Sequence, residues 1–309
     1  MTALVILFLR YHNIRSDFHA RLSNFTLSDE ELYWLARKDT TCAYQNLVEE
    51  KYIPTLIGEL LEDYKGYNSE IDPRIDVYFS GSSFRYGHSG ISGLIRLLDK
   101  DFHQISGDPW LLRDVYVRTE AFLTSGADAA SVLRGLAAEA SKGIDLHFVD
   151  DVAYFTRQMA VVNIQRGRDE GLPSYNDARE WFGFDRVTSF REISLGDEII
   201  EKALANLYAS VDDIDSYVGQ LLDPKNRVMY ASLKEQFTRL RDGDRFWYKN
   251  VLNKTEIENL PTLTEMIRTV FGDAEMFRFP GDSFAVMDDS ASGRDSDQLI
   301  NSNRLSLIE

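Results

Sequence analysis

The chain has 309 residues and a mass of 35.4 kDa, which is long enough to bury a large core without disulfide bonds. Its 34 Lys and Arg face 50 Asp and Glu, and the net charge of −16 argues against nucleic acid and anionic membranes as partners. A single cysteine, Cys42, excludes an intrachain disulfide and a cysteine-based zinc site.

The chain opens on an apolar run over residues 3–9. This run is far shorter than a membrane-spanning helix, which needs about 20 residues. No basic residue precedes it and no small-residue cleavage site follows it, so it does not match a signal peptide. We therefore predict that the run begins a buried helix.

Helical periodicity continues along most of the chain, and Ser28 or Asp29 is expected to cap the next helix. Helices are predicted over residues 29–46, 50–64, 84–99, 110–124, 129–140, 149–167, 175–182, 197–208, 213–221, 230–240 and 262–271. Residues 75–79 are the best candidate for a short strand. The pattern predicts an all-α fold with few or no short strands, forming one domain over residues 1–287. The Ser- and Asp-rich residues 288–309 are predicted to be a disordered tail.

Two segments contain residues that could carry chemistry. In the first, Arg85 and His88 are three residues apart, which places them on one face of the predicted helix. In the second, Asn163 and Arg166 share a face of the helix predicted to end near residue 167. Taken separately, each pattern also fits an ordinary core histidine or a capped helix end followed by a turn.

Taken together, the two segments resemble the paired signatures of the animal haem peroxidase (peroxidase–cyclooxygenase) superfamily. Phe-Arg-Tyr-Gly-His at 84–88 is similar to its proximal-histidine helix, and residues 163–176 are similar to its most diagnostic stretch. Residues 11–13, 133–136 and 242–250 match further pieces in the family's order. The resemblance extends to about residue 271, and residues 239–248 look closest to the peroxidase-homology domains of dual oxidases.

The resemblance implies a mostly helical peroxidase domain that binds haem b. His88 would be the axial ligand of the iron and thus the one metal-binding residue. Asn163, the catalytic residue of this set, would accept the Nδ1–H of His88 and tune its donor strength. Arg85 and Arg166 would bind the haem propionates, so that all four residues contribute to the cofactor site.

The reaction implied is reduction of hydrogen peroxide with oxidation of a small electron donor. In the family, the distal histidine and arginine precede an Arg-x-His-Asn helix, and this sequence begins inside the corresponding segment. His12 belongs to that segment and is not the distal histidine. We therefore expect a further N-terminal segment in the gene product, and slow peroxide turnover by residues 1–309 alone.

Two alternatives stay open at this point. One is a non-catalytic peroxidase-homology module of a dual-oxidase-like protein. The other is a fatty-acid dioxygenase, which is disfavoured because Arg85 stands three residues before His88, where those enzymes place a radical tyrosine. The family is largely extracellular or at the cell surface, and Asn24 and Asn253 begin glycosylation sequons, although no signal peptide is evident.

Overall fold

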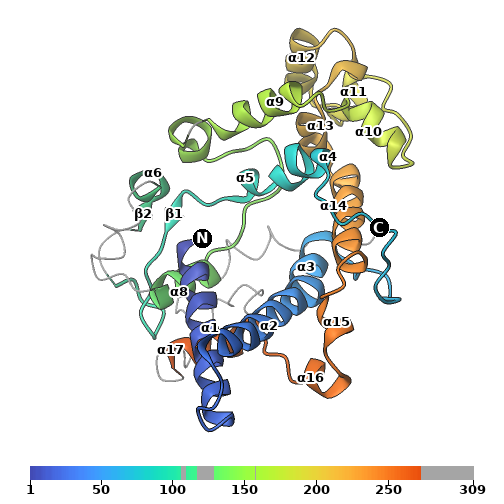
Figure 1. Ribbon diagram of the computed structural model, residues 1–309. Coiled ribbons are helices and arrows are strands. Elements are labelled where there is room, and N and C mark those ends of the chain that lie inside the picture. Colours follow the sequence, from blue (N-terminus) through green and yellow to red (C-terminus); the bar gives the residue numbers. More distant parts are fainter. Residues whose placement is uncertain (106–108, 117–128, 157, 273–309) are drawn as a thin grey trace. The chain divides into compact units, whose positions relative to one another are not determined.

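A computed structural model of the chain describes residues 1–105, 109–116, 129–156 and 158–272 (Figure 1). It is mostly helical, as the sequence predicts. The one strand pair in these residues joins β1 (Leu94–Ile95) to β2 (Trp110–Leu111) in antiparallel register. The boundary predicted at residue 287, between the domain and a disordered tail, stays a prediction, because residues 288–309 lie outside the described residues.

The fold divides into two compact units, each with its own core. Of the described residues, unit 1 takes in those within 1–67, 94–140 and 244–272, and unit 2 takes in those within 68–93 and 141–243. Each unit is assembled from segments that are distant in the sequence. The residues of both predicted chemical segments fall in unit 2.

Unit 1 is built on α1 (Thr2–Leu22) and α2 (Asp29–Leu47), which pack against each other (Figure 1). Ser28 caps α2, because its hydroxyl accepts from the Glu31 backbone N–H while the Glu31 carboxylate accepts from the Ser28 N–H at 2.8 Å. The apolar opening run buries Ala3 and Leu7 in a core shared with α8 (Ala129–Ala138) and α17 (Leu263–Phe271). The run begins a helix, as predicted, but only one face of it is buried, because Leu4, Val5 and Leu9 are exposed.

The other elements of unit 1 are short. They are the π-helical turn η1 (Val48–Tyr52), α3 (Ile53–Ile57), α6 (Leu112–Val115), α15 (Tyr248–Val251) and α16 (Lys254–Glu258). Tyr248 of α15 is buried against Cys42 of α2. Within the described residues, no helix is both long enough and apolar enough to cross a membrane.

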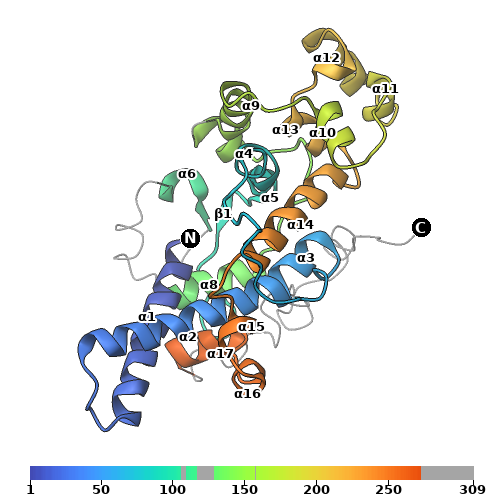
Figure 2. The same cartoon turned by 45° about the vertical axis from the view of Figure 1, so that its right-hand side comes forward.

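Unit 2 holds the remaining helices and turns. They are α4 (Val77–Gly81), η2 (Ser83–Arg85), α5 (Gly87–Gly90), η3 (Asp151–Phe155), α9 (Met159–Asp169), α10 (Tyr175–Trp181), α11 (Phe190–Ile193), α12 (Glu198–Leu207), η4 (Val211–Asp213), α13 (Ser216–Leu222) and α14 (Arg227–Asp242). The core packs Tyr175 and Ala178 of α10 with Leu222 and Val228. The long helix α14 contacts both α13 and α4 (Figure 2).

The predicted helix over residues 84–99 is wrong. The segment instead forms η2, the single turn α5 and then the strand β1, with Ile91 already in an extended conformation. Three glycines in ten residues weaken the helix, and the Ser89 side chain bonds to the loop at 143–145 rather than to its own helix. Contacts distant in sequence therefore outweigh the local apolar pattern.

The predicted strand at 75–79 is also wrong, because Asp76 caps α4 by accepting from the Tyr78 N–H at 2.7 Å.

The helix predicted over 50–64 ends at Ile57, because Gly58 adopts a left-handed conformation with φ 78°. The helix predicted over residues 149–167 is divided into η3 and α9, and Gln158 lies between them with φ 52°. In the segment predicted as a helix over residues 110–124, residues 110–111 form β2 and residues 112–115 form α6. Residues 117–124 lie outside the described part of the chain.

Gly219 in α13 allows the close approach of α10. A Cβ built on Gly219 would overlap the Tyr175 ring, whereas one on Gly87, also helical, would meet nothing within 4 Å. We predict that Gly219→Ala lowers the free energy of unfolding by roughly 1–3 kcal/mol, while Gly87→Ala does not. Urea unfolding of both variants tests this, and equal midpoints would contradict the packing described for α10 and α13.

Candidate functional site

His88 lies in α5, which a hydrogen-bonded loop holds in place. The neighbouring Ser89 is fully buried, and its Oγ lies 3.0 Å from the carbonyl oxygen of Gly143 and 2.7 Å from that of Asp145. The same Oγ accepts from the Asp145 N–H at 2.9 Å. These contacts fix the backbone of α5, so that the half-buried His88 ring has a defined direction.

Asn163 lies in the middle of α9 and is fully buried. Its Nδ2 is 2.8 Å from Nδ1 of His88, which joins two segments 75 residues apart in the sequence. Its Oδ1 is also buried and has no hydrogen-bond partner among the described residues. An amide oxygen in that state costs about 1–3 kcal/mol, so it calls for an explanation.

The orientation of the Asn163 amide decides which nitrogen of His88 can bind a metal. With Nδ2 donating to Nδ1, the ring proton sits on Nε2 and blocks that nitrogen. A half-turn of the amide places Oδ1 against Nδ1, which then carries the proton and donates it, and Nε2 keeps its lone pair. The same half-turn gives Oδ1 a partner and moves Nδ2 into the buried position where Oδ1 has none. The pair thus fits an imidazole that binds iron through Nε2.

The electrostatic surroundings keep the His88 ring neutral. Burial lowers its pKa below the usual 6.5, and the positive charge of Arg85 lowers it further, while the hydrogen bond with Asn163 acts in the opposite direction. A neutral imidazole is the form that ligates a metal. The lowered pKa therefore favours the neutral ring, and the orientation of the Asn163 amide decides which of its nitrogens carries the proton.

The two predicted propionate ligands lie near this pair. Arg85 is half-buried and its Nε donates to the Ser80 carbonyl at 2.8 Å. Arg166 stands one turn of α9 beyond Asn163 and is half-exposed, with its Nη1 3.6 Å from the carboxylate of Glu170. Ion pairs this exposed contribute little to stability, so Glu170 is easily displaced from the guanidinium.

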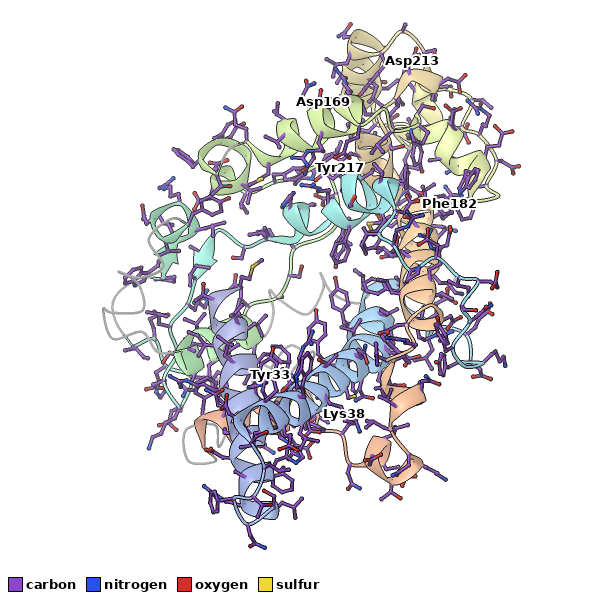
Figure 3. The ribbon with its side chains drawn as sticks, in the orientation of Figure 1. Tyr33, Lys38, Asp169, Phe182, Asp213 and Tyr217 are labelled. Carbon is purple, nitrogen blue, oxygen red and sulfur yellow. The ribbon has the colours of Figure 1, made fainter. Side chains whose placement is uncertain are left out.

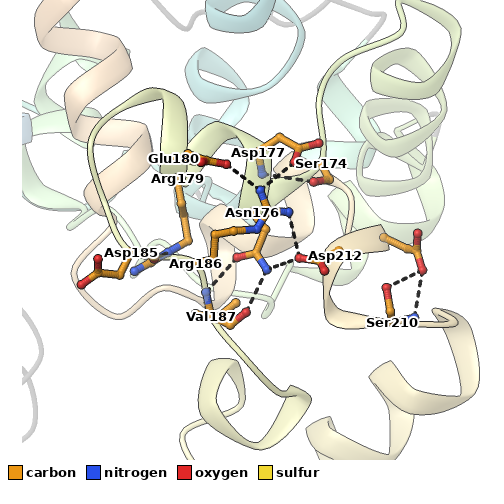
Figure 4. A network of polar contacts seen from close by, with 11 residues as sticks. Ser174, Asn176, Asp177, Arg179, Glu180, Asp185, Arg186, Val187, Ser210 and Asp212 are labelled. Carbon is orange, nitrogen blue, oxygen red and sulfur yellow. Dashed lines mark hydrogen bonds and ion pairs between the residues drawn. The ribbon is translucent and has the colours of Figure 1, made fainter.

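The second half of the 163–176 stretch builds the scaffold of the site (Figure 4). Ser174 caps α10, and the fully buried Asn176 binds both the N–H and the carbonyl of Val187 at 2.9 Å. Nδ2 of Asn176 also donates to the Asp212 carboxylate at 2.6 Å, and Arg186 donates to the same carboxylate at 2.9 Å. These residues position the loops around α10 and make no contact with the histidine.

One residue of the site escapes prediction from the sequence. Tyr217 of α13 is labelled in Figure 3. It is buried, and its hydroxyl donates to the Arg85 carbonyl at 3.3 Å. A cavity of about 40 Å³ beside it is lined by Asn163, Tyr217 and Ser216 among others. A second cavity of unit 2, about 210 Å³ in volume, is lined by none of the four predicted site residues. An Asp-Ser-Tyr sequence at a helix start carries no chemical signature that could have identified Tyr217.

Comparison with known proteins supports the resemblance read from the sequence. Residues 1–276 match the family described as animal haem peroxidase. The chain is 33% identical to a dual oxidase of Drosophila melanogaster, over 81% of this chain and 18% of that protein. It is 31% identical to thyroid peroxidase of Mus musculus, over 93% of this chain and 34% of that protein.

Comparison with solved structures agrees with the family found from the sequence. The solved structure of peroxidase A from Dictyostelium discoideum superimposes with a TM-score of 0.78 at 28% identity, covering 87% of this chain and 54% of that chain. The chain thus spans about half of that solved structure, and about a third or less of the two curated relatives just named.

The His88 pKa gives a direct test of the site in the absence of any cofactor. We predict that His88 titrates below 6.5, that Asn163→Leu lowers its pKa further, and that Arg85→Gln raises it. The opposite signs follow because Oδ1 of Asn163, after the half-turn of the amide, accepts from Nδ1–H of the charged ring and favours it, whereas the charge of Arg85 disfavours it. NMR titration of the ring Cε1–H signal measures the pKa of His88 in the wild type and in both variants. The signal of His88 is identified as the one that is missing from His88→Gly. A shift of the same sign in both variants would contradict the geometry.

Proposed function

Because the chain belongs to the animal haem peroxidase family, we propose that it is a haem-dependent peroxidase that binds b-type haem through Nε2 of His88. The proposed reaction is reduction of hydrogen peroxide coupled to oxidation of a small electron donor. The observation that carries the proposal is the Asn163–His88 contact at 2.8 Å, together with the unpaired amide oxygen of Asn163.

When bound, haem supplies the iron that exchanges electrons with peroxide and donor. The chain's own residues set the conditions for that exchange. His88 provides a neutral imidazole lone pair, and Asn163 holds the Nδ1 proton in place. A neutral amide leaves the imidazole less anionic than a carboxylate partner would, which favours the reduced iron more than a carboxylate does.

Haem also carries two propionates, which a chain of net charge −16 must neutralise locally. Arg85 and Arg166 are the proposed partners. Within the described residues, the guanidinium of Arg85 makes its hydrogen bond through Nε, which leaves both Nη groups for a carboxylate. Arg166 would exchange the weak contact with Glu170 for a propionate.

The proposed location is extracellular or at the cell surface, as in much of the family. Asn24 and Asn253, which begin the two sequons, are both exposed. Asn253 caps α16 through its Oδ1, which leaves Nδ2 for a glycan. The exposure of both residues is compatible with glycosylation, and the location itself stays a proposal.

Haem titration of the whole chain, followed by the Soret band, tests the proposed function. We predict that His88→Gly weakens binding by at least about tenfold and that added imidazole restores the spectrum, because free imidazole can occupy the emptied position. His147→Gly is the matched control, since that ring is 90% exposed in the same unit. An unchanged spectrum in His88→Gly would refute the assignment of the axial ligand.

The same proteins, supplied with peroxide and a small phenol, distinguish a peroxidase from the non-catalytic peroxidase-homology module. Donor oxidation that is lost in His88→Gly and kept in His147→Gly supports a peroxidase. Haem bound at His88 without any turnover would instead favour the non-catalytic peroxidase-homology module.

A further inference from the structure

The larger cavity of unit 2 has no role in the proposed function. It has a volume of about 210 Å³ and is lined mostly by residues of α4, α10 and α14, none of which is a predicted site residue. These three helices belong to the same unit, so the cavity is built within one core. A cavity of roughly 150 Å³ is enough to hold a benzene molecule. The larger cavity therefore has room for one aromatic ring that carries a short chain.

Aromatic side chains form a large part of its walls. Tyr78 of α4 and Phe182, directly after α10, both line the cavity, and their ring centroids are 5.9 Å apart. The buried Phe79 lines it as well and is stacked on Phe84 with the ring centroids 4.7 Å apart. Trp181 also lines the cavity but is 80% exposed. A ligand beside Trp181 would therefore cover a large aromatic surface that the fold itself leaves in water.

Acidic side chains outnumber basic ones among the residues that line the cavity. Asp76 and Glu235 are the carboxylates, and Arg239 is the one cation. Nη1 of Arg239 lies 4.0 Å from the Asp76 carboxylate and 3.8 Å from the Glu235 carboxylate. Its other nitrogens are held by the backbone, because Nε donates to the Asp72 carbonyl at 3.1 Å and Nη2 to the Arg74 carbonyl at 2.7 Å. One guanidinium between two carboxylates leaves a net negative charge, which attracts a cation and repels an anion.

The acidic side of the cavity is fixed by hydrogen bonds to α14. Oε1 of the buried Gln236 accepts from the Asp76 N–H at 2.7 Å, and its Nε2 donates to the Arg74 carbonyl at 3.2 Å. Asp76 is held a second time because its Oδ1 caps α4. Binding therefore does not have to order this segment, which lowers the cost of binding.

We propose that this cavity binds a small aromatic amine in its ammonium form. The aromatic ring of the ligand lies among Tyr78, Phe182 and Trp181, and its ammonium group pairs with Asp76 and Glu235. Aromatic rings gain energy from offset-stacked and edge contacts, and an ammonium group gains from carboxylates and from the face of a tryptophan. The residues involved include neither His88 nor Asn163, so the proposal is independent of haem and of the proposed function.

Calorimetric titration of the whole chain without haem tests the proposal with three probes of similar size. They are tyramine, which is a cation at neutral pH, the neutral 4-ethylphenol and the anionic 4-hydroxyphenylacetate. We expect tyramine to bind at least about threefold more tightly than 4-ethylphenol, and the anion to bind most weakly. This preference should decrease at high salt, because the carboxylates of Asp76 and Glu235 are about half-exposed. Equal affinities for the three probes, or no saturable binding of tyramine, would overturn the proposal.

Two variants locate the binding at this cavity. We expect Glu235→Gln to weaken tyramine binding about two- to fivefold without changing that of 4-ethylphenol, and Trp181→Ala to weaken both. Both side chains are at least half-exposed, so neither change removes a part of the core. Binding of both probes that is unchanged in Trp181→Ala would overturn the proposed position of the ring.

Glu198→Gln is the matched control for the charge. Glu198, like Glu235, pairs with a cation four residues later in a helix of the same unit, but it lines neither of the two cavities described. We expect its tyramine affinity to equal that of the wild type. A loss as large in Glu198→Gln as in Glu235→Gln would show that tyramine responds only to the net charge of −16, and would overturn the site.

Discussion

The hydrogen bond between Asn163 and His88 is the contact on which the rest of the site depends. It joins two segments that are 75 residues apart in the sequence, and each side is held by independent packing. Ser89 ties the histidine turn to the loop at 143–145, while α9 carries the amide at its buried centre. Because both partners are fixed before any ligand arrives, binding does not have to order them, which lowers its cost.

The buried amide leaves one polar atom unpaired, and this has a physical consequence. Metal binding at Nε2 of His88 would turn Oδ1 of Asn163 toward Nδ1 and place Nδ2 in the unpaired position, so that the hydrogen bond between the two side chains is kept with its direction reversed. The lowered pKa of His88 favours metal binding, because a ring that is already neutral releases no proton to the solvent; its one proton has only to sit on Nδ1 instead of Nε2.

The sequence predicted those features that depend on short, local signals. Ser28 and Glu31 mark the start of α2, and the long signature at 163–176 identifies Asn163. The strand at 75–79 and the helix at 84–99 were predicted wrongly, because an Asp76 cap and the bonds of Ser89 to a distant loop decide the backbone there. The position of Tyr217 beside Arg85 could not be predicted at all, since it arises from where α13 packs and from no motif of its own.

Resonance Raman spectroscopy of the reduced, haem-loaded chain carrying ¹⁵N-histidine tests the central claim most directly. We predict an iron–histidine stretching band that shifts with the isotope, disappears in His88→Gly, and moves to lower frequency in Asn163→Ala, because the imidazole loses its hydrogen-bond acceptor. A spectrum without an isotope-sensitive band, or a band that is the same in Asn163→Ala as in the wild type, would contradict the assigned roles of both residues.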